Sequence, residues 1–161
     1  MSPFNFLLLA CLYLNDLVDC QTKDYGVIGI LKNYTEFTFG NVNLLISIPH
    51  DGNLKPTTIA DRDTAGNDVY ARNFSQVVVN ELTRLFSLKY GQPLSPFTIY
   101  NNLDRRKIDV NRGTLENNFC KYSNTNSTLL DDCYQAWLDY HNMIQNNFVT
   151  NFMLKSKYVQ G

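Results

Sequence analysis

The 161-residue sequence contains little of what marks the special classes of protein. It has no block of Lys and Arg, and its 14 basic and 15 acidic residues give a formal net charge of -1. This charge gives no reason to expect a nucleic-acid partner. Internal repeats and low-complexity tracts are absent, which argues against a repeat architecture. With 8 Gly, 5 Pro and 44% hydrophobic residues, the composition is that of an ordinary globular domain.

A hydrophobic run long enough to cross a bilayer is also missing. The longest apolar stretch, FNFLLLACLYL, is too short to span a membrane but suits the core of a signal peptide. We therefore expect residues 1–20 to be a signal peptide and residues 21–161 to form one secreted domain, with no membrane contact after cleavage. The segment before this run has no Lys or Arg, so a buried N-terminal element stays an alternative.

Cysteine is scarce, because removal of the signal peptide leaves only Cys120 and Cys133 of the four. Two cysteines are too few for a scaffold that depends on disulfides, and no Cys-x-x-Cys motif suggests a metal site. The pair closes a short loop rich in Asn, Ser and Thr, so we expect an extracellular disulfide worth roughly 3 kcal/mol. Two free thiols are the alternative.

Three Asn-x-Ser/Thr triplets support the secretory interpretation, although such triplets also arise by chance in an Asn-rich chain. They begin at Asn33, Asn73 and Asn126. We expect at least one of them to carry a glycan.

The apolar patterns predict alternating strands and helices. One or two short strands are expected within 26–40, a buried strand at 43–49 and another strand at 97–103. A helix from about Asp68 to Lys89 should bury one apolar stripe, and a second helix near 133–154, capped by Asp131 or Asp132, should bury another. The two stripes are Phe74, Val77, Val78, Leu82, Leu85 and Phe86, and Trp137, Leu138, His141, Ile144, Phe148 and Phe152. This order predicts an α/β fold, a layered and mostly parallel sheet flanked by helices.

Histidine is scarce as well, and one of the two, His50, lies in the turn Pro49-His50-Asp51-Gly52 that ends the buried strand. Ligands of open α/β sheets bind at the carboxyl ends of strands. Two polar segments should meet there: the loop that carries Asp51, Asp61, Asp63 and Asp68, and the charged segment DRRKIDVNR at 104–112. Histidine with carboxylates suits zinc, and arginine suits a substrate carboxylate. A structural histidine and a solvated arginine-rich loop are the alternatives.

Taken in order, ISIPHDG, DRD, RRKIDVNR and YQAWLDYHNMI resemble the N-formylglutamate amidohydrolase-like family, over about residues 44–153. The resemblance implies a fold related to the zinc carboxypeptidases, of the phosphorylase/hydrolase-like kind. It also implies metal-dependent hydrolysis of an amide bond in a small substrate that carries a carboxylate. The substrate itself and the oligomeric state stay open.

The resemblance also assigns residues. His50 matches the first zinc ligand, and Asp63 is the expected second ligand, in preference to Asp61. Asn111 and Arg112 match the pair that binds the substrate carboxylate, with Arg106 assisting. Asp109 is expected to anchor the loop by accepting hydrogen bonds.

Two further expectations follow from these motifs. His141, on the apolar stripe of the last helix, is expected to be structural. The family's third zinc ligand and its catalytic glutamate lie on later elements than this sequence contains, so we expect a fragment that is inactive by itself. The alternative is a non-catalytic secreted glycoprotein, a binding module that keeps the fold.

Overall fold

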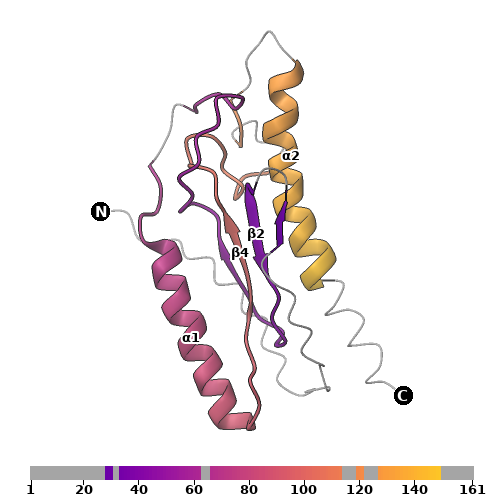
Figure 1. The fold of residues 1–161 in the computed structure, drawn as a ribbon. Helices are drawn as coiled ribbons and strands as arrows, with labels where there is room; N and C mark the ends of the chain where they lie inside the picture. The colour runs from indigo at the N-terminus through magenta and orange to yellow at the C-terminus, as the bar shows by residue number, and fades with distance from the viewer. Residues whose placement is uncertain (1–27, 31–32, 63–65, 114–118, 122–126, 150–161) are drawn as a thin grey trace.

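The computed structural model describes residues 28–30, 33–62, 66–113, 119–121 and 127–149. Its elements in chain order are strands β1 (Ile28–Ile30), β2 (Thr35–Thr38) and β3 (Leu45–Ile48), helix α1 (Ala71–Tyr90), strand β4 (Phe97–Asn101), helix α2 (Ser127–Met143) and a π-helical turn, η2 (Ile144–Val149) (Figure 1). The architecture is mixed α/β, as the sequence predicts. None of the helices in the described part of the chain has the length and apolar content needed to cross a bilayer.

The sheet is small and mixed, with strand order β1-β2-β4-β3. Strands β3 and β4 run parallel, and Ile48 pairs with Tyr100 near their carboxyl ends. The β1–β2 and β2–β4 pairings are antiparallel. The expectation of a mostly parallel sheet therefore does not describe these strands. The difference has a physical reason, because the few residues between β1 and β2 allow only an antiparallel turn, whereas α1 provides the long crossover that a parallel pair needs.

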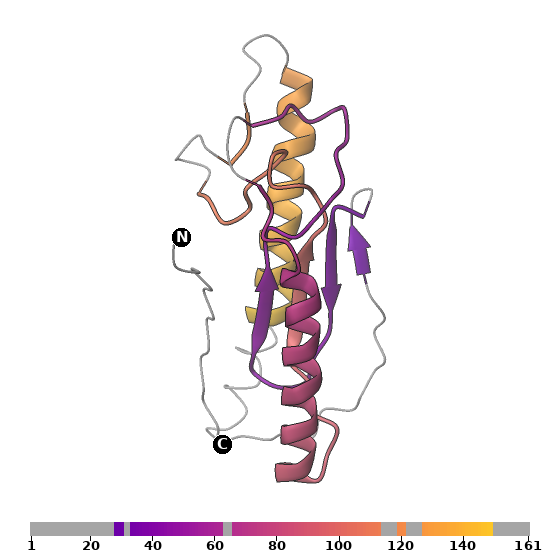
Figure 2. The same cartoon turned by 90° about the vertical axis from the view of Figure 1, so that its left-hand side faces the viewer.

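The two helices lie on opposite faces of the sheet (Figures 1 and 2). On the α2 side, the core contains Phe37 of β2, Ile99 of β4 and Tyr140 of α2. On the α1 side, a smaller cluster contains Ile46 and Ile48 of β3 with Tyr100 of β4, and it packs against α1. Strand β4 lies between β2 and β3, and all five of its residues are buried. This central position makes β4 a rigid support for the loop that follows it.

Helix α1 begins and ends close to its predicted bounds, but it turns a different face toward the sheet. Only part of the predicted stripe packs against the core, including Val78 and Leu82. Three members of the stripe are exposed, namely Phe74, Val77 and Leu85, at 56%, 65% and 46%. Their prediction as buried residues is therefore wrong. The face that contacts the sheet instead includes Ala71, Val79 and the buried Ser75.

The C-terminal end of α1 agrees with the sequence. Gly91 adopts a left-handed conformation, with φ of 69°, and its N–H donates to the carbonyl of Ser87 at 2.8 Å. Glycine suits this position because it has no Cβ to oppose a positive φ.

Helix α2 begins at Ser127, six residues before the predicted start at 133, so neither Asp131 nor Asp132 caps it. The predicted disulfide is confirmed, since Cys120 is bonded to Cys133 within the helix, with their Cα atoms 6.3 Å apart. Beyond η2 the predicted helix continues into residues outside the described part of the chain, and these include Phe152.

Candidate functional site

The carboxyl ends of β3 and β4 carry the two segments that the sequence analysis singles out. Because these strands are parallel, the turn with His50 and the segment 104–112 leave the sheet at the same edge. The two segments run side by side beyond the strands. The N–H of Leu54 donates to the carbonyl of Asn102 at 2.9 Å, and the N–H of Asp104 donates to the carbonyl of Leu54 at 2.9 Å.

The glycine of the Pro-His-Asp-Gly turn allows this close approach. A Cβ atom at Gly52 would collide with the backbone of Asn102 and Leu103. Backbone atoms cannot move aside as a flexible side chain can, so the turn requires a residue without a side chain here.

His50 is 6% exposed, and both of its ring nitrogens face carboxylates. Nε2 lies 2.6 Å from Oδ1 of Asp109, and Nδ1 lies 3.2 Å from Oδ2 of Asp68. Asp68 is held in place by its backbone, since its N–H donates to the carbonyl of His50 at 2.9 Å. The segment before α1 therefore returns to the end of β3 and brings a second carboxylate to this histidine.

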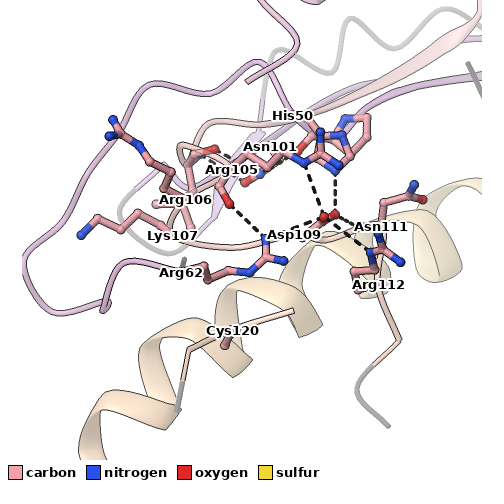
Figure 3. Close-up of polar contacts among 12 residues, drawn as sticks. His50, Arg62, Asn101, Arg105, Arg106, Lys107, Asp109, Asn111, Arg112 and Cys120 are labelled. Atoms are coloured by element: carbon pink, nitrogen blue, oxygen red, sulfur yellow. Dashed lines mark hydrogen bonds and ion pairs between the residues drawn. The ribbon is translucent and has the colours of Figure 1, made fainter. Parts of the chain in front are cut away.

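Asp109 is buried and forms the centre of the cluster in Figure 3. Its Oδ1 accepts the backbone N–H of Asn111 at 3.2 Å in addition to its contact with His50. Its Oδ2 lies 3.4 Å from the guanidinium of Arg105 and 3.7 Å from those of Arg62 and Arg112.

The pKa of Asp109 results from opposing effects. Burial alone would raise it, but the hydrogen bond and charge of His50 and the charges of Arg105 and Arg62 hold the pKa well below its usual value. Asp109 is therefore a permanent carboxylate near neutral pH, which suits the predicted anchoring of its loop.

The structure brings together three of the predicted site residues. His50 and the half-exposed Arg112 approach the two oxygens of the same carboxylate, that of Asp109. Asn111 lies between Asp109 and Arg112 and is exposed. The expected convergence of the histidine turn and the Asn-Arg pair is therefore seen in the described residues.

Other predicted residues lie elsewhere. The guanidinium of Arg106 points away from Asp109 in Figure 3 and pairs with Asp104, Nε to Oδ1 at 3.2 Å. Its expected assistance in carboxylate binding does not fit this position, because the guanidinium is paired with Asp104, two residues before it in the same turn.

Asp63, the expected second zinc ligand, lies outside the described residues. Asp61 pairs with the buried Lys107 at 2.7 Å.

Two arginines of the cluster receive no role from the sequence. Arg105 lies in the same charged segment as Arg112, and this position was the only available signal. Arg62 comes from the opposite polar loop, and its guanidinium also donates to the carbonyl of Arg105 at 3.0 Å. Nothing in the local sequence distinguishes Arg62 from a solvated surface arginine.

His141 lies on α2 and contacts the segment that carries Asn111 and Arg112. Its Nε2 is 2.9 Å from the carbonyl of Val110, which accepts the hydrogen bond. Burial lowers the pKa of His141, an effect that this hydrogen bond partly opposes. A neutral, hydrogen-bonded histidine agrees with the structural role expected from the sequence.

The predicted glycosylation sites are placed in part. Asn33 precedes β2 and is exposed, and Asn73 is exposed in the first turn of α1. Asn126 lies outside the described residues.

Within the part of the chain that the structure describes, no group of three or more His, Cys, Asp or Glu side chains is arranged to hold a metal ion. Among these described residues, His50 and Asp68 are two candidate ligands without a third. Comparison with known proteins gives no match for this chain among protein-family models, curated proteins or solved structures.

Proposed function

We propose that this chain is a secreted protein of the N-formylglutamate amidohydrolase-like kind. In this proposal, the sheet edge around His50 is the metal- and carboxylate-binding part of an amide-hydrolysing site. One observation carries the proposal: the carboxylate of Asp109 contacts His50 at one oxygen and lies beside the guanidinium of Arg112 at the other. The candidate metal ligand, His50, and the candidate carboxylate-binding residue, Arg112, therefore both lie against the same buried carboxylate.

The two side chains proposed as ligands, the imidazole of His50 and the carboxylate of Asp68, are of types that bind zinc. Ligand histidines commonly donate their second ring N–H to a carboxylate, and Asp109 accepts at Nε2 in this way. Zinc binding requires the neutral ring, and that arrangement would then leave the lone pair on Nδ1, 3.2 Å from Oδ2 of Asp68. Two ligands of a tetrahedral zinc ion, each about 2.0–2.1 Å from the metal, lie roughly 3.3 Å apart. Asp68 therefore replaces Asp63 as the proposed second ligand.

The charge of the cluster favours an anionic substrate. Three guanidiniums, those of Arg62, Arg105 and Arg112, surround two carboxylates, those of Asp68 and Asp109. Arg62 and Arg105 are largely buried, whereas the side chain of Arg112 is 52% exposed. Arg112 is thus the arginine best placed to bind a carboxylate from solvent, and the planar guanidinium allows a bidentate contact.

A zinc ion bound at this edge would polarise an amide carbonyl and lower the pKa of a bound water. The protein residues have separate tasks. Asp109 orients the His50 ring, and Arg105 contacts the other oxygen of Asp68 at 3.5 Å. Catalytic zinc sites usually have three protein ligands, so two should bind zinc weakly. We expect no turnover from the described residues alone.

A second candidate function is carboxylate binding without catalysis, as a secreted glycoprotein that keeps the fold. The observation in its favour is that the described residues include no set of three ligands. In this case the arginine cluster would bind an acidic small molecule, and zinc would have no effect on that binding.

Cobalt(II), which substitutes for zinc and absorbs visible light, provides the test. We expect weak cobalt binding by the protein, competed by zinc, and loss of that binding in His50→Gln and Asp68→Asn. Asp68→Asn is the more informative variant because the Asp68 side chain is 55% exposed and its substitution leaves the core intact.

Glu81→Gln is the matched control, since Glu81 is an exposed carboxylate on α1 that, among the described residues, pairs with Arg84 of the same helix. It should bind cobalt like the unmodified protein. Cobalt binding that persists in Asp68→Asn, or no binding at millimolar cobalt, would contradict the metal site. N-acetyl-L-glutamate binding that is independent of metal would then favour the second candidate.

The secretory part of the proposal has a separate test. Expression of the sequence in a secreting eukaryotic cell should give protein in the medium whose gel mobility increases after enzymatic deglycosylation. Protein retained in the cell with unchanged mobility would oppose this part of the proposal alone.

A further inference from the structure

Helix α2 contacts the turn that carries Asn111 and Arg112 through two side chains, one on each side of Asn111. The indole Nε1–H of Trp137 donates to the carbonyl of Arg112 at 2.8 Å. His141, one helical turn further on, donates from Nε2 to the carbonyl of Val110 at 2.9 Å. Figure 3 shows α2 running directly below Asp109 and Arg112.

These two contacts help to hold a short turn, residues 109–112, in place. Within it, the N–H of Arg112 donates to the carbonyl of Asp109 at 3.0 Å, and the N–H of Asn111 donates to the Asp109 carboxylate. The first residue of the turn, Asp109, has contacts that connect it to the sheet edge, including that of its carboxylate with Nε2 of His50 at 2.6 Å. Trp137 and His141 add two, both to carbonyl groups, which do not depend on the side chains of the turn.

The two donors are themselves held firmly. Their rings pack against each other with centroids 3.9 Å apart, and the indole also packs edge-on against Phe119 at 6.1 Å. Phe119 accepts the N–H of Asp109 through its carbonyl at 2.9 Å. The next residue, Cys120, is bonded to Cys133 of α2. Helix α2 is thus connected to both ends of the segment from Asp109 to Cys120.

We infer that Trp137 and His141 are positioning residues that fix the orientation of the Asp109–Arg112 turn, and with it the carboxylate-binding pair Asn111 and Arg112. The inference rests on the proposed function for its biological meaning. Its structural content, the dependence of the turn on two side-chain donors, can be measured without any ligand.

The experiment compares amide hydrogen exchange in four variants. Trp137→Phe and His141→Phe keep an aromatic ring but lose the N–H donor. His141→Gln keeps an N–H donor and should restore the contact. Tyr134→Phe is the matched control, because Tyr134 stacks parallel to Trp137 on the same helix, with ring centroids 6.5 Å apart, and makes no hydrogen bond to the described residues of the turn.

In Trp137→Phe and His141→Phe, we expect the amides of Asn111 and Arg112 to exchange about fivefold faster, the size of effect that one lost hydrogen bond produces. The amide of Ile99, in the buried centre of β4, should keep its rate and so report an intact fold. His141→Gln and Tyr134→Phe should exchange like the unmodified protein. Unchanged exchange at residues 111 and 112 in Trp137→Phe, with β4 intact, would overturn the inference.

A ligand measurement separates this inference from the proposed function. N-acetyl-L-glutamate is the probe, and we expect about fivefold weaker binding in Trp137→Phe, with cobalt binding at His50 and Asp68 unchanged. If the unmodified protein binds no N-acetyl-L-glutamate, the carboxylate-binding proposal fails, while the exchange rates still decide whether α2 positions the turn. If Trp137→Phe binds the probe normally, the positioning of Arg112 by α2 is refuted.

Discussion

The backbone N–H of Asp68 donates to the carbonyl of His50 at 2.9 Å, and the carboxylate of Asp68 lies 3.2 Å from Nδ1 of the same residue. Two residues eighteen positions apart are thus joined by both backbone and side chain. The connection lies where β3 ends and where the chain enters α1. It explains how a polar loop with many aspartates delivers one particular carboxylate to the histidine.

The close packing beside His50 gives the first prediction. Gly52→Ala should destabilise the fold by about 1–3 kcal/mol, the usual cost of overpacking, because the added methyl meets the backbone of Asn102 and Leu103. Gly66→Ala is the control, since a Cβ atom at Gly66 would have no neighbour within 4 Å. Urea denaturation measures both variants, and equal free energies of unfolding would contradict the predicted contact.

The disulfide gives the second prediction. Replacing both Cys120 and Cys133 by Ala should lower the free energy of unfolding by roughly 3 kcal/mol, because the unfolded chain regains the freedom of a short loop. The same loss should follow reduction of the unmodified protein. Before reduction, mass spectrometry after alkylation should find neither thiol modified; two alkylated thiols would show that the bond does not form.

Much of the fold was predictable because local patterns determine it. Ile46 and Ile48 identify β3, the buried run of β4 identifies the next strand, and Gly91 identifies the end of α1. The partner of β2 was not predictable, because pairing with β4 depends on residues sixty or more positions away. The residues in and around β2 do not indicate that it pairs with β4.

The same distinction applies to the site. His50 and Arg112 were expected to converge because the carboxyl ends of parallel strands share one edge, and the structure places both at Asp109. Asp68 was one of four aspartates in the following loop, and its spacing from His50 does not single it out. Its position depends on the backbone hydrogen bond to His50, which only the folded chain shows.

Helix α1, which packs only part of its expected apolar stripe against the sheet, provides the third prediction. Apolar residues lie on two faces of this helix, and only one of these faces packs against the sheet. Leu82 packs against the core, whereas Leu88 is 72% exposed. Leu82→Ala should therefore cost about 2 kcal/mol, at the lower end for core leucines because Leu82 is only partly buried. Leu88→Ala should change the stability by less than about 0.5 kcal/mol. Thermal and urea unfolding of these two matched variants measure the difference directly, and a larger loss in Leu88→Ala would show that this flank of α1 is covered.

The last prediction concerns acid stability. Burial lowers the pKa of His141 in the folded protein, so the unfolded chain, whose histidine titrates near 6.5, binds a proton more readily. The stabilising effect of a neutral His141 is therefore complete above pH 6.5 and is lost as the pH falls through that value toward the lower pKa of the folded state. His141→Gln keeps a donor for the carbonyl of Val110 but cannot titrate. Between pH 7.5 and 5.5, the unmodified protein should lose more stability than His141→Gln in urea denaturation. His50 is present in both proteins, so the difference between them isolates residue 141. Parallel curves for the two proteins over this range would show that His141 titrates normally in the folded state.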